Sequence, residues 1–228
     1  MKKYSIFILF LMGLLLVGCN DMNDSVQPYL DRGEVIYISK SDSAKIFPGY
    51  QRYEVMFWIS DPRASAMQII SSQATDTVTV AIPEHNNKDS IVVLVPAIET
   101  SHNLKLITRD VKGNKSVADE YTVNVYGEKY KSAITNKFYK KAVYNATAST
   151  LTITWGSTTS AKELGVTIYY TDLSGIQQTL HLSTAQTVKP TVISNIDINQ
   201  PVTYSTIVLP EKTSIDSVFS APVALSVK

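Results

Sequence analysis

The sequence predicts an all-β protein made of two tandem antiparallel β-sandwich domains behind an N-terminal export signal. Short runs rich in β-branched and aromatic residues recur about every ten residues from position 35 onward, and turn residues separate them. Several runs alternate apolar and polar side chains, which is the period of a strand with one buried face. The expected segments are a signal peptide over 1–18, a tether over 19–30, a first sandwich over 31–128 and a second over 129–228.

The composition excludes several classes of partner and site. The chain has 228 residues, of which 18% are charged, and its formal net charge is +1. There is therefore no basic field for nucleic acid and no acidic tail. Cys19 is the only cysteine, so the domains are expected to hold no disulfide and no thiolate metal site. Apolar burial alone must stabilise the cores, and 44% hydrophobic residues can supply it.

The first nineteen residues have the form of a processed leader. Lys2 and Lys3 precede an apolar run of about 14 residues, Tyr4 to Val17, which is short for a membrane span. The ending Leu16-Val17-Gly18-Cys19 resembles the lipobox of bacterial lipoproteins. That resemblance implies removal of residues 1–18 and attachment of lipid, such as palmitate, to Cys19. An uncleaved membrane anchor is the alternative, but it gives the Gly-Cys ending no role.

Residues 20–30 are polar and lack periodicity, which is typical of a flexible tether. Asp21 and Asp24 follow the cysteine closely, and this resembles the acidic export signal of Bacteroides-type lipoproteins. The resemblance implies an outer-membrane protein, lipid-anchored and facing the cell exterior. An ordinary solvated linker is the other interpretation.

The first module is expected to contain strands throughout. The second expected strand, Tyr53 to Ile59, is apolar on both faces, which indicates a central or covered strand. Lys112 to Lys115 is expected to form a hairpin turn in which Gly113 and Asn114 accept positive φ. The expected strands are Val35–Ile38, Tyr53–Ile59, Met67–Ile70, Thr77–Ile82, Ile91–Val95, Leu104–Thr108 and Ser116–Val125.

This pattern resembles a fibronectin type III or immunoglobulin-like domain. Three stretches, Tyr29–Tyr37, Asp110–Val117 and Tyr126–Tyr130, are similar to a family of Bacteroides-type lipoproteins that carry a domain of unknown function. The resemblance covers roughly residues 28–145. It implies a place beside glycan-uptake systems and supplies no catalytic residue.

The second module begins with Lys129 to Lys141, a basic and aromatic stretch that is expected to form the junction and the first strand of the module. Its aromatic side chains are expected to pack where the domains meet. Trp58 and Trp155 each end an early strand and lie 97 positions apart, so the modules form a loose repeat. Both indoles are expected in the cores, and stacking on a sugar is the alternative. The expected strands are Leu151–Trp155, Leu164–Tyr170, Ile176–Leu182, Val188–Ile193, Val202–Leu209 and Ser217–Val227.

Residues that might carry chemistry are scattered. His85, His102 and His181 have no ligand spacing, so no metal site is expected. No nucleophile elbow or phosphate-binding glycine loop is present, and the acids fall mainly in loops, where solvated turn residues are expected. The sequence therefore predicts no catalytic residue, no cofactor and no enzyme. The acids considered are Asp61, Glu84, Asp89, Asp110 and Asp172.

A short motif, Asp followed by Ser or Thr and then an apolar residue, occurs five times. It resembles the O-glycosylation acceptor of exported Bacteroides-type proteins, although loop ends that lead into strands would produce the same pattern. The candidate acceptors are Ser25, Ser43, Thr77, Ser90 and Ser217.

The leading functional hypothesis is a non-catalytic surface lipoprotein that binds a glycan or a partner protein of a nutrient-uptake complex, such as outer-membrane transporter components. Sugar binding on a sandwich needs exposed aromatic side chains beside polar groups. A structural or adhesive spacer is the alternative, and an enzyme would need clustered acids or histidines. The candidate ligand-binding residues are Tyr50, Tyr53, Tyr139, Tyr169 and Tyr170.

Overall fold

The structure is a computed structural model that describes residues 26–31, 36–73, 77–83, 89–158 and 160–228. The chain divides into two units, Met1–Tyr37 and Ile38–Lys228. In the first unit, α2 (Gln27–Leu30) is a single helical turn with proline near its start, within the segment expected to be an irregular tether. Among the described residues, no helix is long and apolar enough to cross a membrane.

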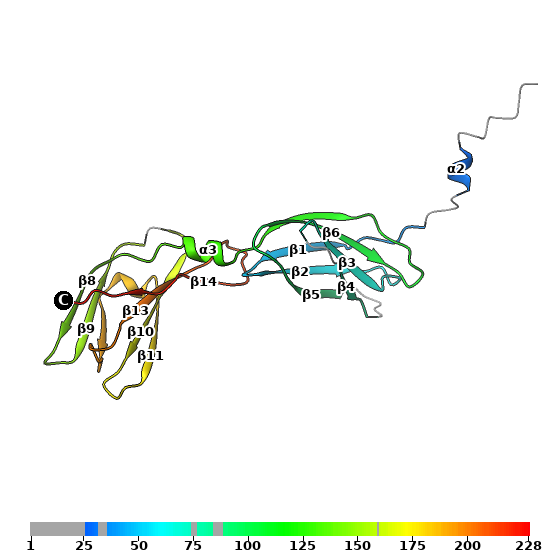
Figure 1. Cartoon of the computed structure of the whole chain (residues 1–228). Coiled ribbons are helices and arrows are strands. Elements are labelled where there is room, and N and C mark those ends of the chain that lie inside the picture. Colours follow the sequence, from blue (N-terminus) through cyan, green and yellow to red (C-terminus); the bar gives the residue numbers. More distant parts are fainter. Residues whose placement is uncertain (1–25, 32–35, 74–76, 84–88, 159) are drawn as a thin grey trace, which may run out of the picture. The chain divides into compact units, whose positions relative to one another are not determined.

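The second unit contains two antiparallel β-sandwiches (Figure 1). In the first sandwich, one sheet has the order β1-β2-β5 and the other has the order β4-β3-β6-β7. The first sheet comprises β1 (Ser43–Pro48), β2 (Arg52–Ile59) and β5 (Asp89–Pro96). The second comprises β3 (Ala66–Ser71), β4 (Val78–Ala81), β6 (Ser101–Arg109) and β7 (Asp119–Asn124).

The second sandwich repeats this strand order. Its smaller sheet is β12-β9-β8, and its larger sheet is β11-β10-β13-β14, with β15 also paired to β13. The strands are β8 (Tyr139–Asn145), β9 (Thr150–Trp155), β10 (Glu163–Thr171), β11 (Gln177–Ser183), β12 (Thr191–Ser194), β13 (Thr203–Val208), β14 (Val218–Phe219) and β15 (Val223–Ala224). A 3₁₀ turn, η1 (Gln186–Val188), leads into β12.

Each sandwich buries its own apolar core between the two sheets. In β2, alternate side chains from Tyr53 to Ile59 are buried, while those between them are half-buried, so the strand has the central position that its two apolar faces indicated. Trp155 is 4% exposed in the second core, as expected. The expectation for Trp58 was wrong: it lies on the outer face of β2, where the Lys45 ammonium sits 5.6 Å from the ring centroid.

Several expected elements differ from the structure. The described part of the expected strand Val35–Ile38 is not a strand, and the chain pairs instead through β1. A short helix, α3 (Glu128–Ala133), occupies the start of the junction, where no helix was expected, and the first strand of the second module begins only at Tyr139. The turn after β6 uses positive φ at Gly113, at +88°, but not at Asn114, whose side chain instead donates to Asp110.

The segment that precedes β14 contacts the connection between β1 and β2; we call this set of contacts the joint. Both carboxylate oxygens of Asp216 accept from the Arg52 guanidinium, at 2.6 and 3.0 Å, and Oδ2 also accepts from the Tyr50 amide at 2.9 Å. These bonds lower the pKa of Asp216, with the Arg52 hydrogen bond as the main cause. Gly49 permits the approach, because a Cβ there would lie 2.7 Å from Asp216 Oδ2.

Candidate functional site

A cavity of about 300 Å³ lies where β10 and β11 meet the turn that leads into β13; we call it the Tyr169 cavity. Tyr169 and Tyr170 follow one another on β10, so their side chains point to opposite faces of the sheet. Tyr170 packs partly against the second core, and Tyr169 lies on the outer face. The lining residues are Tyr169, Tyr170, Thr171, Gln177, Gln178, Thr179, Gln200, Pro201 and Thr203.

None of the residues that line this cavity carries a charge. Three are glutamines, each of which presents both a donor and an acceptor. Gln178 is fixed by a hydrogen bond of 2.9 Å from its amide nitrogen to Asp172 Oδ2. Hydrogen bonds from the Ile176 amide and from Gln178 lower the pKa of Asp172, so this carboxylate is held ionised in the hairpin turn beside the cavity. The arrangement suits an uncharged ligand that carries several hydroxyl groups.

The other candidate tyrosines are committed to structural contacts. Tyr53 was expected at an exposed site, but it is 2% exposed in the first core, because it shares a face with the buried residues of β2. Tyr139 packs edge-on against Tyr204, and its hydroxyl accepts from the Ser226 amide at 2.9 Å. The Tyr50 hydroxyl donates to Glu128, and this hydrogen bond raises the pKa of Tyr50 to about 12. The structure brings only Tyr169 and Tyr170 to a common cavity.

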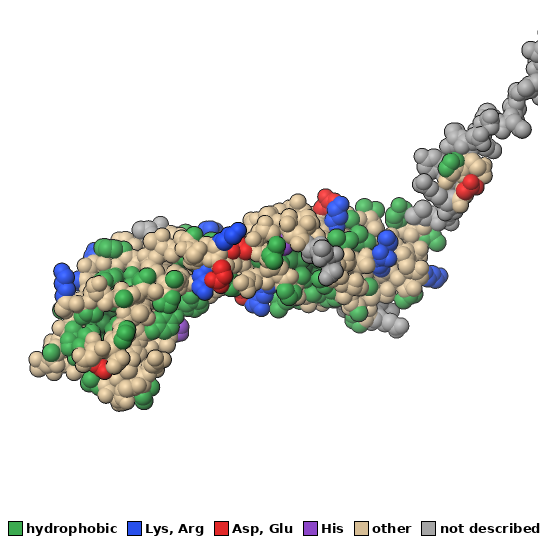
Figure 2. Space-filling view, viewed as in Figure 1, with side chains coloured by type: hydrophobic (Ala, Val, Ile, Leu, Met, Phe, Trp, Pro, Cys, Tyr) green, Lys and Arg blue, Asp and Glu red, His purple; other side chains and the backbone are tan. Residues whose placement is uncertain are grey.

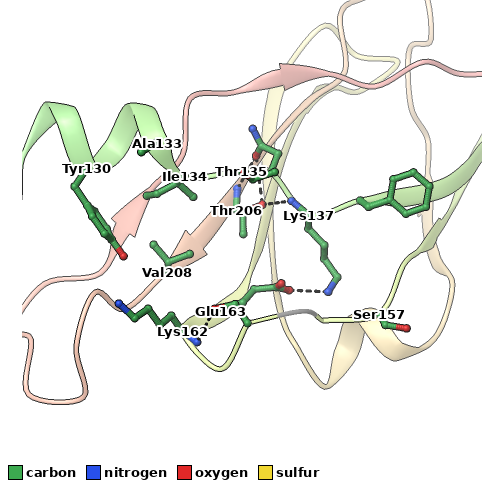
Figure 3. A pocket seen from close by; sticks show the side chains of 13 residues that line it. Tyr130, Ala133, Ile134, Thr135, Lys137, Ser157, Lys162, Glu163, Thr206 and Val208 are labelled. Carbon is green, nitrogen blue, oxygen red and sulfur yellow. Dashed lines mark hydrogen bonds and ion pairs between the residues drawn. The ribbon is translucent and has the colours of Figure 1, made fainter.

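A second cavity of about 350 Å³ lies beside a buried ion pair (Figure 3); we call it the Lys137 cavity. Lys137 Nζ donates to Glu163 Oε1 at 2.6 Å and to Thr158 Oγ1 at 2.8 Å. The side chains of Lys137 and Glu163 are only 1% and 6% exposed. No pattern in the sequence points to this pair, because Lys137 is one of several lysines in the junction and its partner is 26 positions away.

Polar side chains anchor the chain on both sides of Lys137. The Lys137 amide donates to Thr206 Oγ1 at 2.6 Å, and Asn136 Oδ1 accepts from Ser220 Oγ at 2.6 Å and from the Thr206 amide at 3.1 Å. The ion pair therefore belongs to a network that fixes the segment entering β8 onto β13. Phe138, which was expected to pack at the domain junction, is 69% exposed instead.

The expected chemical and modification sites are distributed over the chain. No three His, Cys, Asp or Glu side chains come together at metal-binding distance within the part of the chain that the structure describes. Asp61, expected to be a solvated turn residue, is 8% exposed and receives two bonds from the Arg63 guanidinium. Cys19 and Ser25 lie outside the described residues. The remaining candidate acceptors for O-glycosylation are exposed: Ser43, Thr77, Ser90 and Ser217.

Both sandwiches pack a three-stranded sheet against a larger one, of four strands in the first sandwich and five in the second, and all their named strands pair antiparallel. This strand order is that of a fibronectin type III-like domain. The chain belongs to the DUF4998 family, described as a domain of unknown function, whose model matches residues 19–218. The match therefore extends over both sandwiches, whereas the sequence resemblance was expected to cover residues 28–145. Comparison with curated protein sequences finds no match.

Comparison with solved structures finds tandem fibronectin domains. The chain is similar to the FN1–FN3 domains of chicken CNTN1, with 11% identity and a TM-score of 0.38 over 83% of this chain and 67% of that one. It is also similar to a two-domain fibronectin type III segment of chicken tenascin, with 10% identity and a TM-score of 0.31 over 82% of this chain and 97% of that one.

Proposed function

We propose that this protein is a non-catalytic, lipid-anchored surface module that binds a neutral glycan in the Tyr169 cavity. The observation that carries the proposal is a cavity lined by Tyr169, on the outer face of β10, and by three glutamines, without a charged side chain. Many binding proteins and spacer proteins share this fold, so the fold does not specify the function. The support for glycan binding comes from the residues that line the cavity.

The side chains of the cavity match the two surfaces of a sugar ring. Of the two tyrosines, Tyr170 packs against the core, so Tyr169 is the one that is free to contact a ligand. Its ring supplies an aromatic face for the apolar C–H face of a pyranose. Gln177 and Gln200 supply amide donors and acceptors for neighbouring hydroxyl groups. The absence of charge in the lining favours neutral sugars over uronic acids or sulfated sugars.

Affinity gel electrophoresis of the full chain through a panel of neutral polysaccharides tests the proposal. We expect at least one polysaccharide to retard the chain, and Tyr169→Ala or Gln177→Ala to abolish that retardation. Tyr37→Ala is the matched control, because Tyr37 is 61% exposed and lies outside the cavity. Retardation that survives both cavity substitutions would place the glycan elsewhere.

We further propose that lipid on Cys19 anchors the protein in the outer membrane, facing the cell exterior. The support is the short apolar leader ending in Gly18-Cys19 and the two acids, Asp21 and Asp24, that follow it. A surface glycan-binding protein in this location would act beside outer-membrane transporter components of a nutrient-uptake complex. Labelled palmitate should enter the wild-type protein but not Cys19→Ser, and equal labelling of both would contradict the anchor.

O-glycosylation at one or more Asp-Ser/Thr motifs is a separate proposal. Ser43 and Ser90 pair with Trp58 from either side, so they lie in one row across the outer face of the β1-β2-β5 sheet. A glycan on either residue would lie beside the half-buried Trp58 indole. Intact-mass analysis of the native protein should show mass beyond polypeptide and lipid, and a mass accounted for by those two components alone would remove the proposal.

A structural spacer is the second candidate function, and the joint favours it. Asp216 hydrogen-bonds Arg52 and the Tyr50 amide, so it links the segment before β14 to the first sandwich. In a spacer, this link between the two sandwiches would be the functional property. A glycan-binding defect of Tyr169→Ala would distinguish the binding module from a simple spacer.

A further inference from the structure

Strand β5 has one edge that no described strand pairs. It pairs with β2 over its whole length, from Ile59↔Asp89 to Arg52↔Pro96, and within the described residues it has no second neighbour (Figure 1). The amide and carbonyl groups along the other edge therefore point away from the sheet and are oriented to pair with a further strand.

The other edge strands carry features that discourage pairing with another chain. Natural sheets use short strands, charged side chains, proline or irregular register at their edges. In β5 a charged residue and a proline, Asp89 and Pro96, occur only at the two ends of the strand. β5 alone among the described edge strands is eight residues long and has an uninterrupted apolar centre, Ile91 to Val95. Charged side chains occur in three of the other edge strands: Lys45 in β1, Asp119 and Glu120 in β7, and Lys140 and Lys141 in β8, which also has a register shift. The sequence of β11 is mostly polar. The remaining edge strands are short, with four residues in β4 and β12 and two residues in β14 and β15.

The outer face of β5 is also exposed and apolar. Val92 and Leu94 are each 51% exposed, and Val92 pairs with Met56, which is half-buried on the same face of β2. Hydrophobic side chains gather along this side of the first sandwich in Figure 2. The counterpart in the second sandwich, β12, has a single exposed valine, Val192, and its neighbour β9 presents threonines.

We propose that β5 is a self-association edge, through which two copies of this chain pair antiparallel to form one continuous six-stranded sheet. The occupant is a second copy because the strand is complementary to itself about Val93. With Val93 opposite the partner's Val93, Val92 lies opposite the partner's Leu94, and Ile91 lies opposite the partner's Val95. This register keeps core-facing side chains opposite core-facing side chains in both copies.

Cysteine pairs test both the contact and its register. Full chains that carry Val92→Cys and Leu94→Cys are mixed, oxidised with copper phenanthroline and separated on a non-reducing gel. We expect a band at twice the chain mass from the mixture and little from either chain alone, because like positions are offset by two residues and are too far apart for a disulfide. The parental chain controls for Cys19. Lys45→Cys mixed with Leu94→Cys controls for random collisions, since Lys45 is on β1, at the opposite edge of the same sheet from β5.

Three results would overturn the proposal. The mixture could remain monomeric while circular dichroism shows intact strands. The control pair could cross-link as strongly as the test pair, which would mean unspecific association. The cross-link could join the chain to a different protein, which would make β5 a site for another partner.

A substitution in the edge provides the second measurement. Val92→Lys places a charge on the proposed contact and should weaken the dimer at least tenfold in sedimentation equilibrium, with detergent micelles in excess. Val192→Lys is the matched control, because Val192 is a similarly exposed valine on the edge strand β12, and it should leave the dimer unchanged. A wild-type chain that stays monomeric, or a Val92→Lys chain that dimerises as well as wild type, would refute the proposal.

Discussion

The buried pair of Lys137 and Glu163 makes a quantitative prediction about stability. Their charged atoms are 2.6 Å apart, and the two side chains are 1% and 6% exposed. Lys137→Met removes the cation and leaves the Glu163 carboxylate buried without a charged partner. Breaking a buried pair in this way costs about 3–5 kcal/mol, because desolvation of the remaining charge is no longer offset. At a urea m-value of about 1–3 kcal/mol/M, the unfolding midpoint should fall by roughly 1–5 M.

The assay must report on the second sandwich alone. The chain has two tryptophans, and only Trp155 lies in the second core, so a Trp58→Phe background makes the fluorescence specific to that sandwich. The double substitution Lys137→Met with Glu163→Leu should recover most of the loss, since replacing both charges by apolar groups is often neutral or stabilising.

A surface ion pair provides the control. Lys105→Met removes the partner of Glu120, but these side chains are 57% and 70% exposed, so the change should stay below about 1 kcal/mol. A free energy of unfolding for Lys137→Met within about 1 kcal/mol of that of the Trp58→Phe background would contradict this prediction, because a change of that size is typical of a surface ion pair.

Three further predictions follow from local contacts. The hydrogen bonds from Arg63 hold the pKa of Asp61 below its usual range. They therefore contribute fully to the free energy of unfolding above the unfolded-state pKa of about 3.9, and this contribution is lost as the pH falls through the folded-state pKa. Asp61→Asn should lack this loss of stability in an acid titration. Gly165→Ala should severely destabilise the second sandwich, because a Cβ at φ +156° would lie 1.9 Å from the Leu182 carbonyl oxygen; a thermal midpoint like that of wild type would contradict this. Asp216→Ala should release the joint, so limited proteolysis should cut the segment before β14 faster than in wild type.

The alternation of apolar and polar residues along the strands predicted most of the architecture. The same alternation also determines which side chains of β2 share a face. Tyr53 lies an even number of positions from Val55 and Phe57, so it shares their face of β2, which is the buried face. Trp58 lies an odd number of positions from them and therefore falls on the outer face. The prediction of a buried Trp58 was wrong because β2 is apolar on both faces, so its sequence does not show which face is the buried one. In β9 the other face is threonine, and there the position of Trp155 was predicted correctly.

The candidate site was only partly predictable. Tyr169 and Tyr170 were identified from their adjacency, but the glutamines beside them come from β11 and from a turn about thirty residues further along the chain. The burial of Lys137 gave no signal, because lysine is almost never fully buried and its partner is distant in sequence. The six residues of α3 are too few to show a helical period.

Binding of the full chain to an array of neutral and acidic glycans, with Tyr169→Ala and Tyr37→Ala run beside it, tests the proposed function most directly. We expect signals on neutral glycans only, lost in Tyr169→Ala and retained in Tyr37→Ala. A chain that binds only acidic glycans, binds none, or binds equally well without the Tyr169 ring would contradict a neutral-glycan site in this cavity.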